Sequence, residues 1–132
     1  MVNLKWKAVF LGSILTTVIA IAAAFVASEL TGLGLRGYLS TNFGAEFPNR
    51  SLENSVYDYF KQPQWVALNV LLIALAYAVS GFLTARIAGT RFALHAALAA
   101  VPAAIIFLSI WSPLFIGMSS IGGLAAKHMH AK

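Results

Sequence analysis

Two long uncharged runs joined by a short basic turn constrain the fold of this chain most strongly. The runs cover residues 65–85 and 92–111, and Arg86 and Arg91 lie in the turn between them. About 20 helical residues cross the roughly 30 Å hydrocarbon core of a bilayer, so each run is long enough for one transmembrane helix. The sequence therefore predicts a transmembrane helical hairpin, with a kink in its second helix at Pro102.

The composition excludes an ordinary water-soluble domain. Of the 132 residues, 60% are hydrophobic and 10% are charged, and the mean hydropathy is +0.81, whereas about 25% of the residues in soluble domains are charged. The net charge of +5 comes from basic residues beside apolar runs, which indicates contacts with anionic lipid and no binding to nucleic acid. Because the chain has no cysteine, disulfides, iron–sulfur clusters and thiolate zinc sites are excluded.

Two more segments are candidates for membrane crossing. Residues 8–28 follow Lys5 and Lys7 and fit either a first transmembrane helix or a signal peptide. We expect a retained helix, because the apolar region of a signal peptide rarely exceeds about 15 residues. Residues 112–126 are short for a crossing, which requires a thinned bilayer, a re-entrant path or a longer helix. The predicted fold is an all-α membrane protein with four transmembrane helices in a single membrane domain, residues 1–132.

Residues 29–64 form the predicted extracytoplasmic loop and contain all four acidic residues of the chain. Glycine and proline predict irregular backbone in its first half, at Gly32, Gly34, Gly37, Gly44 and Pro48. In residues 51–62 the apolar side chains recur at helical spacing. This pattern favours a short amphipathic helix on the membrane surface, and an ordered loop is the alternative.

Basic residues are divided unequally between the two sides of this arrangement. One side carries six basic residues and no acid: Lys5, Lys7, Arg86, Arg91, Lys127 and Lys132. The other side carries three basic residues against four acids. Because loops rich in Lys and Arg remain on the cytoplasmic side, we expect both termini in the cytoplasm and the chain in a bacterial inner membrane.

Small residues recur on the predicted helices at spacings that favour close helix contact. They occupy every fourth position of residues 8–28, and the same spacing recurs in residues 81–89. Apolar burial gives little driving force between helices in lipid, so association depends on small residues that let backbones approach. We expect nine residues to mediate helix packing: Gly12, Thr16, Ala20, Ala24, Gly81, Ala85, Gly89, Gly122 and Gly123.

No acidic residue falls inside a predicted span, so the best candidate for an ionisable group within the membrane is His95. The candidate polar site around it lies beside the basic turn. It consists of His95, Arg91, Arg86, Ser80 and Thr84. His95 could act as a proton site, a quinone hydrogen-bond donor or a haem ligand, although a histidine bonded to a neighbouring group is the simpler interpretation. Met118 would lie about 15 Å from the level of His95 by helix rise, so the two cannot ligate one haem. We expect no cofactor and no metal ion.

The two sides of the basic turn carry a further resemblance. Residues 81–89 read Gly-Phe-Leu-Thr-Ala-Arg-Ile-Ala-Gly, and residues 94–97 read Leu-His-Ala-Ala. This order resembles a pattern in several small multi-pass bacterial membrane proteins that have no assigned activity, where a glycine-rich helix end and a basic turn precede a histidine. The resemblance covers about 20 residues. It implies the helical hairpin and no particular function.

These features lead to three hypotheses about function. The first is a non-enzymatic accessory or assembly subunit, whose small-residue helix faces pack against other membrane subunits or against itself. The alternative is a small oligomeric channel or carrier that uses Ser80, Thr84, Arg86 and His95 near its inner mouth. Polar side chains could also line a path down the first helix of the hairpin, namely Asn69, Tyr77, Ser80 and Thr84, although such groups more often bond a neighbouring helix. The third is a redox subunit that holds a cofactor at His95. The expected partners are the lipid bilayer and other membrane proteins.

Overall fold

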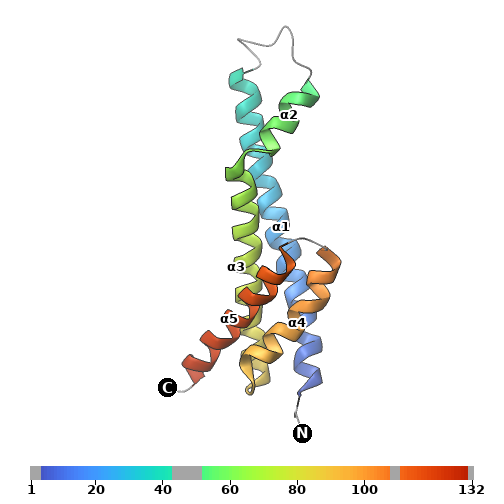
Figure 1. The fold of residues 1–132 in the computed structure, drawn as a ribbon, viewed down its shortest axis with the longest axis vertical. Coiled ribbons are helices and arrows are strands. Elements are labelled where there is room, and N and C mark those ends of the chain that lie inside the picture. Colours follow the sequence, from blue (N-terminus) through green and yellow to red (C-terminus); the bar gives the residue numbers. More distant parts are fainter. Residues whose placement is uncertain (1–3, 43–51, 108–110, 131–132) are drawn as a thin grey trace.

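The computed structural model describes residues 4–42, 52–107 and 111–130, and every regular element in these ranges is an α-helix. Five helices follow one another along the chain (Figure 1): α1 (Trp6–Asn42), α2 (Leu52–Phe60), α3 (Pro63–Ala88), α4 (Phe92–Phe107) and α5 (Ser112–His130). The predicted all-α class is confirmed. By length and composition, α1 and α3 could each cross a membrane, and α4 is a shorter apolar helix.

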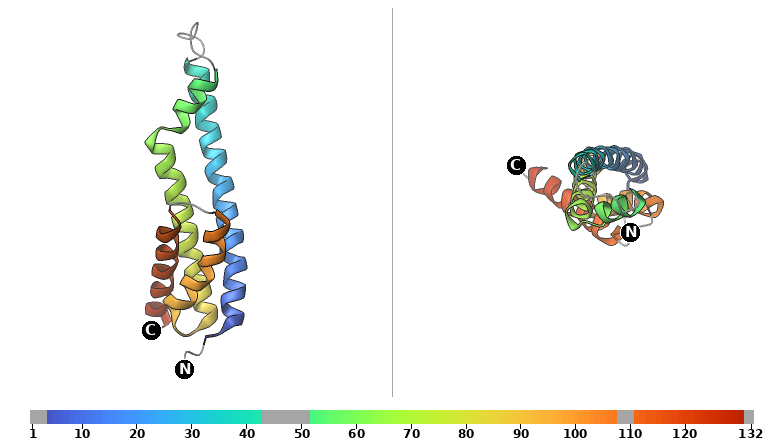
Figure 2. Two further views of the ribbon diagram at one scale, coloured as in Figure 1. Left: turned by 45° about the vertical axis from the view of Figure 1, so that its right-hand side comes forward. Right: turned by 90° about the horizontal axis from the view of Figure 1, so that it is seen from above.

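The molecule has two unequal halves along its long axis. Helices α1 and α3 lie side by side, and α4 and α5 form a hairpin that packs along only one end of this pair (Figures 1 and 2). We call this end the four-helix half, with residues 6–24 of α1, residues 74–88 of α3, α4 and α5. We call the opposite end the two-helix half, because only α1 and α3 are paired along it. It contains residues 25–42 of α1, residues 63–73 of α3 and the short helix α2. The start of α1 and the end of α5 lie at the tip of the four-helix half (Figure 1).

Most large apolar side chains lie outside, and most buried side chains are alanine or small polar residues, with Tyr59, Tyr77 and Phe115 as large buried side chains. Phe10 and Leu71 are 68% and 57% exposed, whereas Ala85, Ala96 and Ser119 are fully buried. In the most apolar 18-residue stretches, only 22% of the residues of α1 and 28% of those of α3 are buried. A long apolar helix in a water-soluble protein is normally buried in the core. The distribution in this chain is the reverse of that arrangement.

Helix α1 is much longer than predicted. Residues 29–42, expected to begin an irregular loop, continue the helix to Asn42, so the loop prediction is wrong for this stretch. Each glycine in a helix costs up to about 1 kcal/mol relative to alanine, but tertiary contacts outweigh that preference here. Gly34, for example, lies so close to Tyr59 and Trp65 that a Cβ atom would collide with both side chains. Gly44 and Pro48, also assigned to the loop, lie outside the described residues.

The other boundaries differ less from expectation. Helix α4 is described as far as Phe107, and residues 108–110 of the predicted run lie outside the described residues. Helix α5 extends to His130, so the helix over the short predicted segment 112–126 is longer than expected. Pro102 lies inside α4, and Figure 1 shows this helix changing direction along its length. Helix α2 lies within the segment where a short helix was predicted. Pro63 begins α3, because the first helical turn needs no proline N–H group.

The turn between α3 and α4 depends on one glycine. Gly89 has a φ of 65°, and its N–H group donates to the carbonyl of Ala85 at 3.0 Å, which closes the last turn of α3. Side chains other than glycine rarely adopt this conformation. A Cβ atom at Gly89 would meet no neighbouring atom within 4 Å. Among the described residues Gly89 therefore has no helix-packing contact, and the residue terminates α3.

Candidate functional site

Four of the five glycines predicted to mediate helix packing lie between helices of this chain. A Cβ atom at Gly12 would lie 2.9 Å from the Cβ atom of Ala99 on α4, and one at Gly81 would collide with Ser119 on α5. On α5, Gly122 similarly faces the backbone of Ala78. These contacts bring α1, α3, α4 and α5 together at backbone distance, so the glycine faces are occupied within the molecule.

The remaining predicted packing residues differ in burial, and Gly123 completes the glycine contacts. A Cβ atom at Gly123 would lie 2.7 Å from the Phe92 carbonyl oxygen. Thr16, Ala20 and Ala85 are buried, but Ala24 is only half-buried. Residues spaced by four rotate about 40° around a helix at each step. The buried face of α1 therefore moves from Ala20 to Ala27 and Thr31 in the two-helix half.

His95 joins the beginnings of two helices. The fully buried imidazole accepts a hydrogen bond from the backbone N–H group of Lys5 at its Nε2 atom, 3.1 Å away, and its Nδ1 atom lies 3.2 Å from the carbonyl oxygen of Arg91. A carbonyl can only accept and a backbone N–H can only donate, so these partners select the neutral tautomer with the proton on Nδ1. The histidine thus ties the start of α1 to the first turn of α4.

The other members of the candidate polar site do not converge on His95. Arg86 and Arg91 are exposed, and the guanidinium of Arg86 lies 5.7 Å from the centre of the Phe82 ring. Ser80 and Thr84 are buried, but their hydroxyl groups donate to carbonyls of their own helix at 3.0 and 2.8 Å. The structure therefore divides the five predicted residues into internal hydrogen-bonding groups and external cations.

Two polar contacts in the four-helix half were not identified from the sequence. The Ser119 hydroxyl donates to the carbonyl of Ala96 at 2.9 Å, which ties α5 to α4. The ring of Tyr77 stacks on Phe115 with a centroid distance of 5.3 Å, and its buried hydroxyl has no partner within the described chain. A serine in a Gly/Ser-rich segment gives no sequence pattern for such a contact, because the partner depends on the register between helices.

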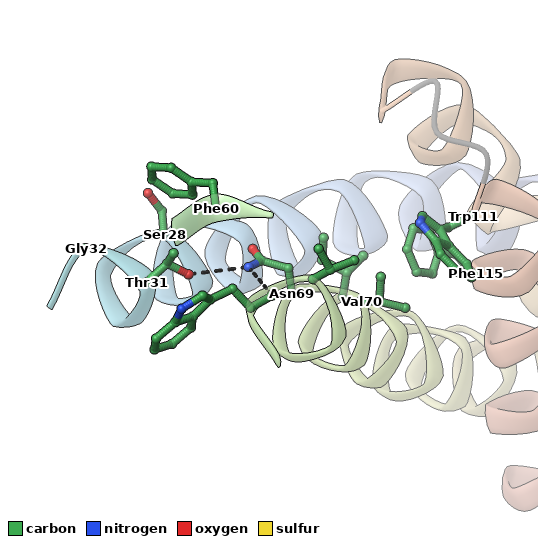
Figure 3. A pocket seen from close by; sticks show the side chains of 11 residues that line it. Ser28, Thr31, Gly32, Phe60, Asn69, Val70, Trp111 and Phe115 are labelled. Carbon is green, nitrogen blue, oxygen red and sulfur yellow. Dashed lines mark hydrogen bonds between the residues drawn. The ribbon is translucent and has the colours of Figure 1, made fainter. Parts of the chain in front are cut away.

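A cavity of about 590 Å³ lies where the α4–α5 hairpin ends and the two-helix half begins (Figure 3). Residues from α1, α2, α3 and α5 line it. Its polar side is formed by Ser28, Thr31 and Asn69, and its apolar side includes Val70 and Phe115. The cavity exists because α4 and α5 stop short of the far ends of α1 and α3, so it combines segments that are far apart in the sequence.

Asn69 organises the polar side of the cavity. Its amide nitrogen donates to the carbonyl of Trp65 at 2.8 Å and lies 3.4 Å from the hydroxyl oxygen of Thr31. Because a carbonyl can only accept, the nitrogen must face Trp65, which leaves the amide oxygen directed elsewhere. Figure 3 shows that oxygen turned away from both partners. It is the acceptor that this side of the cavity offers.

Helix α2 closes the same region through Tyr59. The hydroxyl group of this buried tyrosine donates to the carbonyl of Thr31 at 3.1 Å, and its ring lies 5.3 Å from that of Tyr38 and 5.1 Å from that of Trp65. Burial raises the pKa of the Tyr59 hydroxyl, which keeps it protonated as a donor. We call Thr31, Tyr59, Trp65 and Asn69 the aromatic clasp. It was missed because Thr31 was assigned to a loop.

Comparison with known proteins gives no relative. No protein-family model matches the chain, and neither a curated protein nor a solved structure matches it. The functional argument therefore depends on the geometry of the described residues.

Proposed function

We propose that this chain is an integral membrane protein whose four long helices lie in the bilayer. The observation that carries the proposal is the reversed distribution of side chains, with large aliphatic and aromatic groups outside and hydroxyl groups, histidine and glycine contacts inside. Lipid tails solvate large apolar side chains, whereas polar groups must find partners within the bundle. Water would favour the opposite distribution.

The proposed orientation places the tip of the four-helix half in the cytoplasm of a bacterial cell. Arg91 and Lys127 line a common hollow at this tip, and the backbone of Lys5 contacts His95 beside them. A cluster of cations at one end fits the cytoplasmic side of an inner membrane, where anionic lipids attract it. Helices α4 and α5 span about 24 and 28 Å at 1.5 Å per residue. Some thinning of the bilayer would accommodate them.

Within that membrane we propose a non-enzymatic accessory or assembly subunit. Both ring nitrogens of His95 are already bonded to the backbone, so a role as axial ligand or proton carrier would require these bonds to break. Thr84 packs directly against Gly12, which leaves no room for a water path at that level inside one chain. Since the glycine faces are occupied internally, a partner would contact the exposed aliphatic faces of the helices instead.

Mild detergent extraction followed by native mass spectrometry tests this function. We expect the chain to leave the membrane in a stoichiometric complex with a larger membrane protein. A homo-oligomer that conducts ions in liposomes would instead favour the channel, and a visible absorption band of the purified chain would favour the redox subunit. Recovery of the chain from the soluble fraction would contradict the membrane location itself.

A further inference from the structure

We infer that the cavity beside the aromatic clasp binds a single-tailed, uncharged amphiphile with a hydroxyl-bearing headgroup, drawn from the surrounding lipid. This inference rests on the proposed membrane location and is independent of the accessory role. It follows from the polar groups at one side of the cavity, the apolar surface at the other, the absence of charge in the lining and the size of the space.

The polar side provides a site for a hydroxyl group. Both N–H groups of the Asn69 amide are directed at protein acceptors, on Trp65 and Thr31, whereas its oxygen has no partner among the described residues and is not a buried atom. The exposed Ser28 side chain lies at the same cavity. In a membrane, an acceptor such as this amide oxygen is costly to leave unpaired. A hydroxyl headgroup would donate to the Asn69 oxygen.

A second polar atom beside the cavity also lacks a partner. The indole N–H group of Trp65 is buried without an acceptor among the described residues, and Trp65 lines the cavity. A hydroxyl oxygen can accept one hydrogen bond while its proton is donated to another group. One hydroxyl-rich headgroup would therefore complement both the Asn69 oxygen and the Trp65 nitrogen, after a small shift of the indole that uncovers its N–H group.

The opposite side of the cavity fits the beginning of an alkyl tail. Val70, Ile73 and Phe115 line it, and Phe115 is itself buried against Tyr77. Trp65 and Ile73 are eight positions apart on α3, which is about 12 Å along the helix axis. The cavity therefore holds the headgroup and the first part of a tail, and the rest of the tail continues into the surrounding lipid.

The charge of the lining and the volume of the cavity indicate the chemical class of the ligand. Among the described residues, no lysine, arginine, histidine or acidic residue lines the cavity, so a charged headgroup would lose its hydration without a compensating partner there. The cavity volume of about 590 Å³ is within the range of small-molecule sites, about 300 to 1,000 Å³.

Tryptophan fluorescence provides the test, because two of the three tryptophans line the cavity. The exposed Trp6 at the far end of the molecule is removed by Trp6→Phe. The remaining fluorescence of Trp65 and Trp111 is measured in phosphatidylcholine vesicles while 9,10-dibromostearoyl glycerol is added as an uncharged quenching probe. We expect quenching that saturates at a low mole fraction of the probe, above the linear effect of lipid that merely surrounds the protein.

Two glycines of α1 give a matched pair of variants. A Cβ atom at either Gly32 or Gly37 would meet no atom within 4 Å, but only Gly32 lines the cavity. Gly32→Leu should fill the cavity and raise the half-saturating probe fraction at least about tenfold, whereas Gly37→Leu should leave it within about twofold. Asn69→Leu should weaken binding by about tenfold, which is the loss expected for one hydrogen bond.

The outcomes are separable from those of the proposed function. Failure of the chain to enter vesicles would overturn the membrane location. Entry into vesicles with linear quenching in all variants, or equal effects of Gly32→Leu and Gly37→Leu, would overturn only the binding site. Saturable quenching by a dibrominated phosphatidylglycerol at the same mole fraction as by the glycerol ester would show that the headgroup class is wrong.

Discussion

Different contacts hold α1 and α3 together in the two halves of this molecule. In the four-helix half, glycines on α1, α3 and α5 allow backbone contact, and buried hydroxyl groups donate to carbonyls. In the two-helix half, α5 reaches α3 only at the boundary, near Phe115. Bulky aromatic rings from α2 and α3 join α1 and α3 there instead. The first arrangement leaves little internal space, whereas the second leaves a cavity. The difference in length between the α4–α5 hairpin and the pair α1 and α3 therefore determines which half is tightly packed and which half has space for a ligand.

The largest expected effect is at a glycine of the four-helix half. Gly122→Leu would force side-chain atoms into the backbone of Ala78 on α3, and backbone cannot move aside as a flexible side chain can. Overpacking of this kind costs about 3 kcal/mol or more. Gly117→Leu on the same helix is the control, because a Cβ atom there meets nothing within 4 Å. Equal unfolding midpoints of both variants in a denaturing-detergent titration would contradict the close packing of α5 on α3.

Removal of the His95 side chain should have the next largest effect. His95→Ala leaves a cavity in the bundle and deprives the Lys5 N–H group of its partner, whereas the Arg91 carbonyl keeps its bonds from the backbone N–H groups of Leu94 and residue 95. We expect a cost of about 2–4 kcal/mol. Hydrogen exchange at the start of α1 should accelerate most, because that end loses its tie to α4. The control is His128→Ala, since His128 is exposed. Unchanged exchange at the start of α1 would show that the histidine does not hold the two helices together.

Loss of one bond in the aromatic clasp should have a smaller and more local effect. Tyr59→Phe removes the hydrogen bond to the Thr31 carbonyl but keeps the ring contacts, and we expect a loss of about 0.5–1.5 kcal/mol. Exchange should increase in α2 and in the C-terminal part of α1, with no change in α4 or α5. Tyr57→Phe is the control, because Tyr57 is exposed. Faster exchange spread evenly over both halves would contradict their independence.

The smallest expected effect is a pH dependence of the same clasp. Burial raises the pKa of Tyr59 above its ordinary value of 10.0, so the unfolded chain loses this proton first as the pH rises. The contribution of Tyr59 to stability is therefore full below about pH 10 and is lost above it. The difference in stability between the wild type and Tyr59→Phe should stay constant below about pH 10 and shrink as the pH rises above that value. A difference that stays constant above that value as well would contradict the burial of this hydroxyl.

The fold class and the α3–α4 reversal could be predicted from the sequence because both depend on local patterns. Uncharged runs of sufficient length identify long apolar helices, and Gly89 beside basic residues marks a helix end. The extension of α1 through Gly32, Gly34 and Gly37 could not be predicted in this way. At Gly34 the deciding contact comes from Tyr59 and Trp65, which are distant in the sequence.

The candidate site shows the same division between local and long-range information. The sequence suggests that His95 bonds a neighbouring group, and one partner, the Arg91 carbonyl, is four positions away, but the other, the Lys5 N–H group, is 90 positions away in the chain. The sequence also shows that residues 112–126 form a short segment, but it does not show which parts of the other helices this segment leaves uncovered. A hairpin that ends early leaves α1 and α3 uncovered, and only the three-dimensional arrangement shows that Thr31 and Asn69 meet there.

Single-cysteine labelling tests the membrane arrangement most directly, because the chain contains no cysteine of its own. Lys7, Thr90 and Lys127 are exposed at the tip of the four-helix half, and Ser40 is exposed near the end of the two-helix half. With a membrane-impermeant maleimide added to intact bacterial cells, we expect labelling of Ser40→Cys alone, and labelling of the other three only after the membrane is opened. Labelling of positions 7 and 127 from opposite sides, or of positions 40 and 90 from the same side, would contradict a bundle that crosses the bilayer with its basic tip in the cytoplasm.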